Sequence, residues 1–223
     1  GDRFACALSA LGEVLCWGEN GNGELGDETT TNRDTPGFIH STQKFSAINA
    51  GFRRACALTE DGQVYCWGGL GLGGKPTPLT GLPVVTYVAE NGCSIGTDRA
   101  LYCISSGAAT QKVAGFEAPV VGVSAGVRYT CALTEGGAAF CWGQGHMGEL
   151  GLGDNSPYIV ETPTQVVGLT SGVTEISCST GAMGVTCALV GSEGKAMCWG
   201  YGLSGLLGDG TRESSNVPVT VLW

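Results

Sequence analysis

The stretch that decides the fold is FACALSALGEVLCWG, residues 4–18. It has the pattern of a strand, a tight turn at a glycine, a second strand and a Trp-Gly exit. The pattern returns at residues 55–68 (ACALTEDGQVYCWG), 130–143 (TCALTEGGAAFCWG) and 186–200 (TCALVGSEGKAMCWG), with a degenerate copy at 92–104 (GCSIGTDRALYCI). The chain is therefore built from repeats, and repeats determine the architecture of the whole fold.

Ten of the eleven cysteines fall in pairs within these hairpins, ten or eleven positions apart. With the turn at the midpoint, the two cysteines of a pair face each other across an antiparallel hairpin. Opposed Cβ atoms lie about 4.5–5.5 Å apart there, close to the spacing that a disulfide needs. The sequence therefore predicts five hairpin disulfides: Cys6–Cys16, Cys56–Cys66, Cys93–Cys103, Cys131–Cys141 and Cys187–Cys198.

Two other interpretations of the cysteines fit the sequence less well. Zinc sites use ligands two to four positions apart in paired clusters, and no such spacing occurs here, so no metal is expected. Five pairs of buried thiols are a second alternative, disfavoured by the regular repetition. Cys178 stands outside the pairing, as a thiol left over. It is interpreted either as a buried core cysteine or as a bond to a segment or partner outside this chain.

Charge and disulfides restrict the compartment and the partners. Persistent disulfides imply an oxidising location, which means extracellular, periplasmic or on the cell surface. A net charge of −9 argues against nucleic acid and against docking on anionic lipid. No apolar run approaches the roughly 20 residues of a membrane span. No leader opens the chain, so we expect any signal peptide to have been removed or to lie outside this numbering.

The repeats divide the chain into five units, expected at residues 1–44, 45–84, 85–119, 120–172 and 173–223 of one domain, 1–223. Each unit combines an alternating strand, the hairpin, a glycine-rich excursion and a proline-bearing edge segment. No stretch has a helical period, which predicts an all-β fold. The distances between first cysteines bracket the repeat of about 40–50 residues that is typical of a β-propeller blade.

The excursions carry a second motif, GELG at residues 23–26 and 148–151 and LLGDGT at 206–211. Together with CWG, this repeat resembles that of the regulator of chromosome condensation family over essentially the whole chain. The resemblance implies a β-propeller with four-stranded blades, and the paired cysteines are similar to its extracellular branch of secreted bacterial repeats and plant crinkly-type ectodomains. Family propellers usually have seven blades. About five blades are expected here, either as a closed ring or as part of a seven-bladed propeller.

No catalytic constellation is visible, and an enzyme is not expected. The two histidines, His40 and His146, are isolated, and the glycine runs lack the Lys-Ser/Thr of a phosphate loop. No loop has the spaced oxygen ligands of a calcium site, and no cofactor is predicted. One tryptophan occupies an equivalent position in four units. We interpret this set as packing between blades rather than as a carbohydrate platform: Trp17, Trp67, Trp142 and Trp199.

The leading functional hypothesis is a non-catalytic scaffold that binds a protein or glycan through its divergent excursions, because binding usually lies in loops on a rigid frame. Residues 28–34 and 155–159 are the candidate loops. One alternative is a structural module of a surface filament or receptor ectodomain, through homo-assembly or a larger parent chain. Another is inhibition of a secreted hydrolase, as one bacterial family member does. Nucleotide exchange on a small GTPase, the founding nuclear role, is disfavoured because disulfides do not suit the nucleus.

Overall fold

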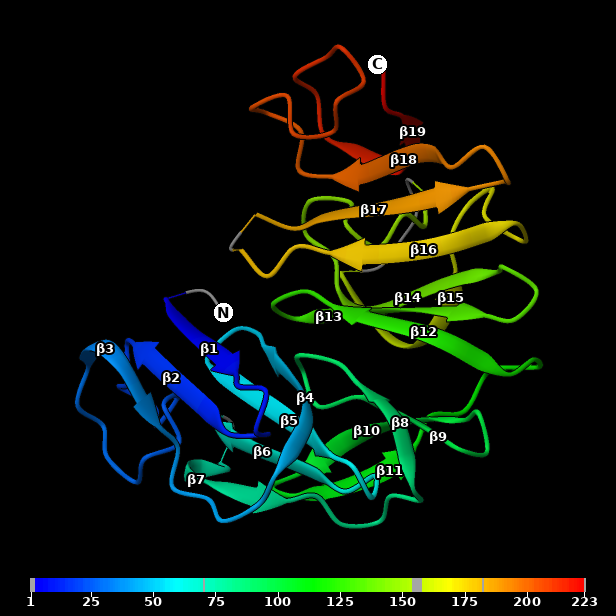
Figure 1. Ribbon diagram of the computed structural model, residues 1–223. Coiled ribbons are helices and arrows are strands. Elements are labelled where there is room, and N and C mark those ends of the chain that lie inside the picture. Colours follow the sequence, from blue (N-terminus) through cyan, green and yellow to red (C-terminus); the bar gives the residue numbers. More distant parts are fainter. Residues whose placement is uncertain (1–2, 70, 154–157, 182, 223) are drawn as a thin grey trace. The chain divides into compact units, whose positions relative to one another are not determined.

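The computed structural model describes residues 3–69, 71–153, 158–181 and 183–222 of the 223-residue chain. Within this described part there are nineteen β-strands and no helix (Figure 1). The strands form five antiparallel sheets, each made of consecutive strands. We call these sheets blades 1 to 5. The prediction of an all-β repeat fold with about five blades is confirmed.

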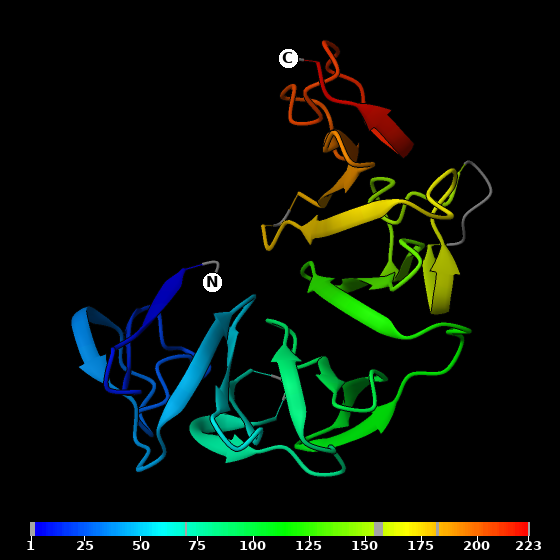
Figure 2. The ribbon, with the colours of Figure 1, turned by 45° about the vertical axis from the view of Figure 1, so that its right-hand side comes forward.

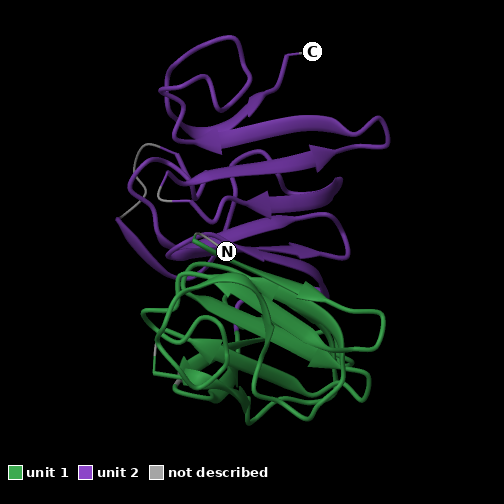
Figure 3. Ribbon diagram, turned by 60° about the vertical axis from the view of Figure 1, so that its left-hand side comes forward, with its two compact units in different colours: residues 1–113 green, residues 114–223 purple. Residues whose placement is uncertain are grey.

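The chain divides into two compact units, residues 1–113 (unit 1) and 114–223 (unit 2), coloured separately in Figure 3. Unit 1 contains three blades. Blade 1 consists of β1 (Phe4–Leu8), β2 (Val14–Gly18) and β3 (Arg33–Phe38). Blade 2 consists of β4 (Phe45–Ala50), β5 (Arg54–Thr59), β6 (Val64–Gly68) and β7 (Gly73–Pro78). Blade 3 consists of β8 (Val85–Val88), β9 (Ser94–Gly96), β10 (Leu101–Ser106) and β11 (Ala109–Lys112).

Unit 2 contains the remaining two blades. Blade 4 consists of β12 (Val120–Ala125), β13 (Tyr129–Thr134), β14 (Ala139–Gln144) and β15 (Ile159–Gln165). Blade 5 consists of β16 (Val173–Cys178), β17 (Val185–Val190), β18 (Lys195–Gly200) and β19 (Ser215–Thr220). The five sheets fall within the five sequence units expected, while the grouping of all five into one domain stays a prediction.

Within each unit, neighbouring blades pack through their inner strands. In unit 1, β4 lies against β1, and β8 lies against β5. In unit 2, β16 lies against β12 and β13, as Figures 1 and 2 show. Buried aliphatic and aromatic side chains from adjacent blades form the cores; in unit 2 the core extends from Tyr129 to Trp199.

The hairpins have the register that the cysteine spacing requires. Cys6 lies directly opposite Cys16, and Cys131 opposite Cys141. The structure has five disulfides, which join Cys6–Cys16, Cys56–Cys66, Cys93–Cys103, Cys131–Cys141 and Cys187–Cys198. Each disulfide joins the two sides of the repeated hairpin, so every blade has its own covalent crosslink.

Candidate binding surface

Two of the four repeated tryptophans join one blade to the next. The indole Nε1 of Trp67 donates a hydrogen bond to the backbone oxygen of Glu24 in the preceding blade, at 2.9 Å. Trp199 makes the same bond to Glu149, also at 2.9 Å. Both tryptophans are fully buried. A buried indole N–H requires an acceptor, and here the acceptor comes from the GELG motif of the blade before.

The GELG motif is shaped to receive that tryptophan. Gly26 and Gly151 have positive φ angles, and a Cβ on either would lie 2.8 Å from the indole Nε1. The leucine of each motif is buried in the core. The Glu149 carboxylate turns back to accept a hydrogen bond from the backbone N–H of Met147, at 2.6 Å. The residues of the repeated GELG motif therefore hold neighbouring blades together.

Trp17 and Trp142 are only partly buried. Trp142 follows the repeat whose excursion is degenerate, and its ring packs edge-to-face against Phe116 with centroids 6.1 Å apart. Its indole N–H makes no hydrogen bond with any residue in the described part of the chain. The structure thus places the four equivalent tryptophans in two different environments, a difference that the identical CWG motifs do not reveal.

Cys178 lies at the end of β16, where the other repeats have Ala50 and Ala125. Its side chain is 7% exposed, and its Sγ lies 3.6 Å from the backbone oxygen of Ser124. Its backbone N–H donates to the Ser124 hydroxyl oxygen at 3.0 Å. Because the sulfur is enclosed between blades 4 and 5, a bond to another chain would require these strands to separate.

The first of the two candidate loops, residues 28–34, is engaged within unit 1. The Glu28 carboxylate pairs with Lys75 of blade 2 at 3.2 Å and with His40 at 3.1 Å. The Arg33 guanidinium pairs with Asp27 at 2.7 Å. Two charged side chains of this loop, Glu28 and Arg33, are therefore paired within unit 1, although the buried Nε of Arg33 has no hydrogen-bond partner among the described residues.

The corresponding end of unit 2 differs, because it exposes large apolar side chains. Six of them are 46–57% exposed. We call this set the apolar patch: Met147, Tyr158, Ile159, Met183, Leu203 and Leu206. Residues 155–157 of the second candidate loop lie outside the described residues, while Tyr158 and Ile159 belong to the patch. Sequence reasoning missed the other four, although apolar side chains inside glycine-rich excursions were a usable signal.

Local contacts hold the loops that carry the apolar patch. The ring of His146, beside Met147, packs on Tyr158 with centroids 3.7 Å apart. Gly184, beside Met183, packs against the Glu149 side chain that caps Met147. The backbone N–H of Gly202, beside Leu203, donates to the Ser214 hydroxyl at 3.1 Å. The second of these contacts joins the β16–β17 loop of blade 5 to the excursion of blade 4, whereas the first and third each lie within one excursion.

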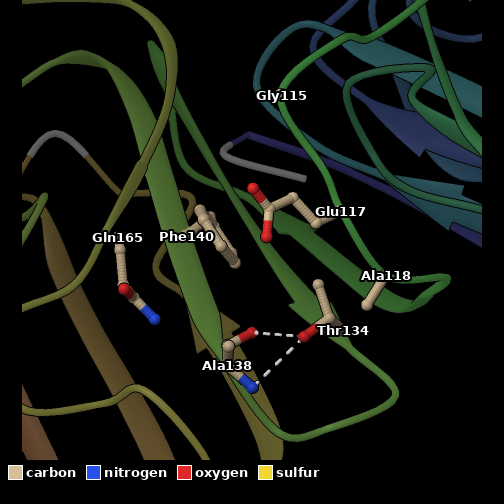
Figure 4. A pocket seen from close by; sticks show the side chains of 7 residues that line it. All are labelled: Gly115, Glu117, Ala118, Thr134, Ala138, Phe140 and Gln165. Carbon is tan, nitrogen blue, oxygen red and sulfur yellow. Dashed lines mark hydrogen bonds between the residues drawn. The ribbon is translucent and has the colours of Figure 1, made fainter.

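A pocket lies at the opposite end of blade 4, near the β13–β14 turn (Figure 4). Its volume is about 380 Å³. It is lined by Gly115, Glu117, Ala118, Thr134, Ala138, Phe140 and Gln165, all in unit 2. No group of His, Cys, Asp and Glu side chains among the described residues is arranged to hold a metal ion. Nor does that part of the chain contain a helix long and apolar enough to cross a membrane.

Known proteins share this repeat. Two profiles, both described as "Regulator of chromosome condensation (RCC1) repeat", match residues 1–24, 45–69 and 120–149, and residues 136–183. The Arabidopsis thaliana protein "RCC1 domain-containing protein RUG3, mitochondrial" is 30% identical over 233 residues. The match covers 99% of this chain and 45% of that relative, so the chain spans less than half of its length.

Solved structures of low sequence identity share the fold. Prp20p from Saccharomyces cerevisiae matches with a TM-score of 0.80 at 20% identity, over 100% of this chain and 62% of that chain. The CRINKLY WD40 ectodomain of the Arabidopsis thaliana receptor kinase ACR4 matches with a TM-score of 0.58 at 20% identity, over 100% of this chain and 64% of that chain. The likeness supports the expected blade architecture.

Proposed function

This chain belongs to the regulator of chromosome condensation (RCC1) repeat family and has its β-propeller fold, and we propose that it is a non-catalytic module that binds a protein partner through the apolar patch. A fold does not by itself specify a function, so the proposal is drawn from the surface. Prp20p, which shares the fold, is described by its binding to Gsp1p and histones. That precedent supports protein binding as something a propeller of this type can do.

The apolar patch is the observation that carries the proposal. Grouped exposed apolar side chains mark an interaction site more often than isolated ones do, and these six lie on loops or, for Ile159, at the first residue of β15, at one end of blades 4 and 5. Two of the six side chains are methionines, whose flexible thioethers adapt to the shape of a partner. Only one of the six, Tyr158, is aromatic. A protein partner with apolar side chains therefore fits this surface better than a glycan, which would favour flat aromatic rings.

We place the protein in an oxidising compartment, outside the cell, in a periplasm or on a cell surface. The support is the set of five disulfides, since such bonds are rarely kept in reducing compartments. The relative RUG3 is named as mitochondrial, so the compartment is argued from the cysteines and not from kinship. The enclosure of Cys178 argues against covalent assembly through that thiol.

A peptide-display selection tests where binding occurs. Peptides would be selected on the oxidised wild-type protein and then measured against the variant Met147→Ser/Leu203→Ser. The matched control is Leu11→Ser/Val121→Ser, which removes two apolar side chains that are also exposed but lie outside the patch. We expect the selected peptides to lose most of their affinity for the patch variant and to keep it for the control.

The opposite pattern would contradict the proposal. Peptides that bind the patch variant as well as the wild type would place the binding surface elsewhere. A selection that yields no peptide above background from repeated rounds would also count against an apolar docking surface. Circular dichroism and thermal melting of both variants confirm that the substitutions on the surface leave the fold intact.

A further inference from the structure

We propose that the pocket of unit 2 binds a cationic side chain, specifically an arginine presented by a protein partner. We call it the Glu117 pocket, lined by the seven residues named above. It lies at the turn end of blade 4, whereas the apolar patch lies at the excursion end. The inference therefore stands independently of the proposed function, and each can fail without the other.

The walls of the Glu117 pocket are held in place by contacts within unit 2. Phe140 of β14 is the strand partner of Gln165 of β15. The Phe140 ring packs edge-to-face on Phe116, with centroids 5.4 Å apart and an interplanar angle of 75°. The segment that carries Glu117 is tied to the hairpin turn, because the backbone oxygen of Pro119 accepts a hydrogen bond from Glu135 at 2.9 Å. A preorganised site loses less entropy when it binds a ligand.

The lining groups are an aromatic ring, a carboxylate and an amide, without a basic residue. Figure 4 shows Glu117 and Gln165 on opposite sides of Phe140, with the Glu117 carboxylate turned toward the ring. Neither side chain forms a hydrogen bond or ion pair with any residue that the structure describes. Glu117 is thus an exposed carboxylate that lines the pocket, and it has no cationic partner among the described residues.

Arginine matches this set of groups. A guanidinium is planar, stacks on aromatic rings and pairs with a carboxylate through two parallel hydrogen bonds. Its remaining N–H groups can donate to the amide oxygen of Gln165. An anion would be repelled by Glu117, and a purely apolar ligand would remove water from that carboxylate without replacing its hydrogen bonds.

The turn of blade 1 provides a comparison for one wall of the pocket, the turn that carries Thr134 and Ala138. The turn from Ser9 to Glu13 corresponds to the turn from Thr134 to Ala138, since both close with the same backbone hydrogen bond. In blade 1 the Glu13 carboxylate holds the ammonium group of Lys44 at 2.8 Å.

In blade 4 the corresponding positions are Ala138 and Gly172. The N–H of Phe45 donates a hydrogen bond to the oxygen of the turn glycine, Gly12, and the N–H of Val173 donates to Gly137 in the same way. Lys44 and Gly172 correspond because each comes directly before the donor. Blade 1 therefore has an ion pair at these two positions, where blade 4 has two small residues. Of the two, Ala138 lines the Glu117 pocket, so the pocket wall carries no charge at the position of Glu13.

The charge of unit 2 favours a cationic guest. Residues 114–223 include nine acidic and three basic residues, for a formal charge of −6. A field of this sign raises the local concentration of cations and accelerates the approach of a basic partner.

Nuclear magnetic resonance with a small probe tests the inference directly. N-acetyl-L-arginine amide would be titrated into the oxidised protein, with the methyl signals of Ala118 and Ala138 and the side-chain amide of Gln165 as readouts. We expect saturable shifts confined to these groups. The neutral isostere N-acetyl-L-citrulline amide and the sugar N-acetylglucosamine should cause none.

Two substitutions distinguish the effect of the Glu117 carboxylate from the effect of removing a negative charge elsewhere in unit 2. Glu117→Gln should weaken arginine binding by roughly threefold to fivefold, the range of an exposed ion pair. Glu175→Gln, which makes the same change at an exposed position on blade 5, should leave it within error. Phe140→Leu should also weaken binding, because the ring is lost while the apolar volume is largely kept.

Three results would overturn the inference. The first is that the arginine probe causes no saturable shift at millimolar concentrations. The second is that the citrulline probe or the sugar causes shifts of the same size. The third is that Glu117→Gln binds the arginine probe as tightly as the wild type does. The patch variant Met147→Ser/Leu203→Ser should bind the probe normally. Normal probe binding together with failed peptide selection would therefore reject only the proposed function.

Discussion

The indole nitrogen of Trp67 lies 2.9 Å from the backbone oxygen of Glu24, forty-three positions earlier in the chain. The bond crosses from blade 2 to blade 1 and is buried at both ends. The same relationship joins Trp199 to Glu149 across fifty positions. In both pairs the tryptophan of one repeat is held by the excursion of the repeat before it, so blade-to-blade packing within each unit depends on two motifs acting together.

Replacing Trp67 with phenylalanine should destabilise unit 1 by about 2–3 kcal/mol. The backbone oxygen of Glu24 would be buried without its donor, and a buried unsatisfied group costs about 1–3 kcal/mol, in addition to lost packing. Trp199→Phe should cost less, because Thr186 also donates to the Glu149 oxygen, at 2.8 Å. Urea unfolding followed by far-ultraviolet circular dichroism measures both. Trp142→Phe is the control, and a loss as large as that of Trp67→Phe would contradict this account.

Gly143→Ala should destabilise the protein by roughly 3 kcal/mol or more. Gly143 has a φ of +111°, and a Cβ there would lie 2.5 Å from the backbone oxygen of Arg128. Both the backbone conformation and the close approach therefore exclude a side chain. Gly136→Ala is the matched control, since a Cβ there meets nothing within 4 Å. Thermal melting of the two variants should separate them clearly, and similar melting temperatures would refute the steric argument.

Removing one staple with Cys131→Ala/Cys141→Ala should cost about 2–3 kcal/mol on the loop-entropy model. The disulfide closes a loop of ten positions in sequence, which is short.

Thiol titration of the oxidised wild type should detect Cys178 slowly in the native state and rapidly in denaturant, because its sulfur is enclosed. Rapid native reaction would show that the β16 strand end opens. More than one reactive thiol per denatured chain would contradict the five pairings.

Tyr129 should make the stability of unit 2 fall at alkaline pH. Burial is the main cause that raises the pKa of this phenol above its ordinary value near 10. Its contribution is therefore fully present below pH 10 and is lost as the pH rises toward the folded-state value. The hydroxyl donates to the Val185 backbone oxygen at 3.0 Å. Tyr129→Phe should lower stability by about 1 kcal/mol at neutral pH and show a flatter decline above pH 10.

Urea titrations across this pH range compare the two proteins. Tyrosinate absorbance provides a second readout, because one of the six tyrosines should ionise only when the wild type unfolds. Complete ionisation of all six in the folded protein would contradict the burial argument, and Tyr158→Phe, at an exposed site, controls for loss of a phenol.

The hairpins could be predicted from the sequence because their information is local. A two-residue side-chain period, a glycine near the midpoint and cysteines at matching distances specify which residues oppose one another. The pairing of Cys131 with Cys141 follows from counting outward from the turn. The same logic predicted the number of blades, since each blade repeats the hairpin.

The environments of identical motifs could not be predicted in this way. Trp142 and Trp199 follow the same Cys-Trp-Gly pattern, yet only Trp199 is fully buried, because its surroundings depend on the excursion of another repeat. The excursions of blades 4 and 5 likewise form a surface only when the two blades pack together.

The sequence by itself determined the strands, the turns and the register of each staple, because these depend on residues within about a dozen positions. Tertiary structure decided which tryptophans are fully buried, which large apolar side chains stay exposed in the patch, and how Glu117, Phe140 and Gln165 come to line one pocket. These groups lie far apart along the chain, and their proximity results from the packing of whole strands. Local pattern cannot specify such contacts, since the free energy that forms them comes from the core between the strands and blades.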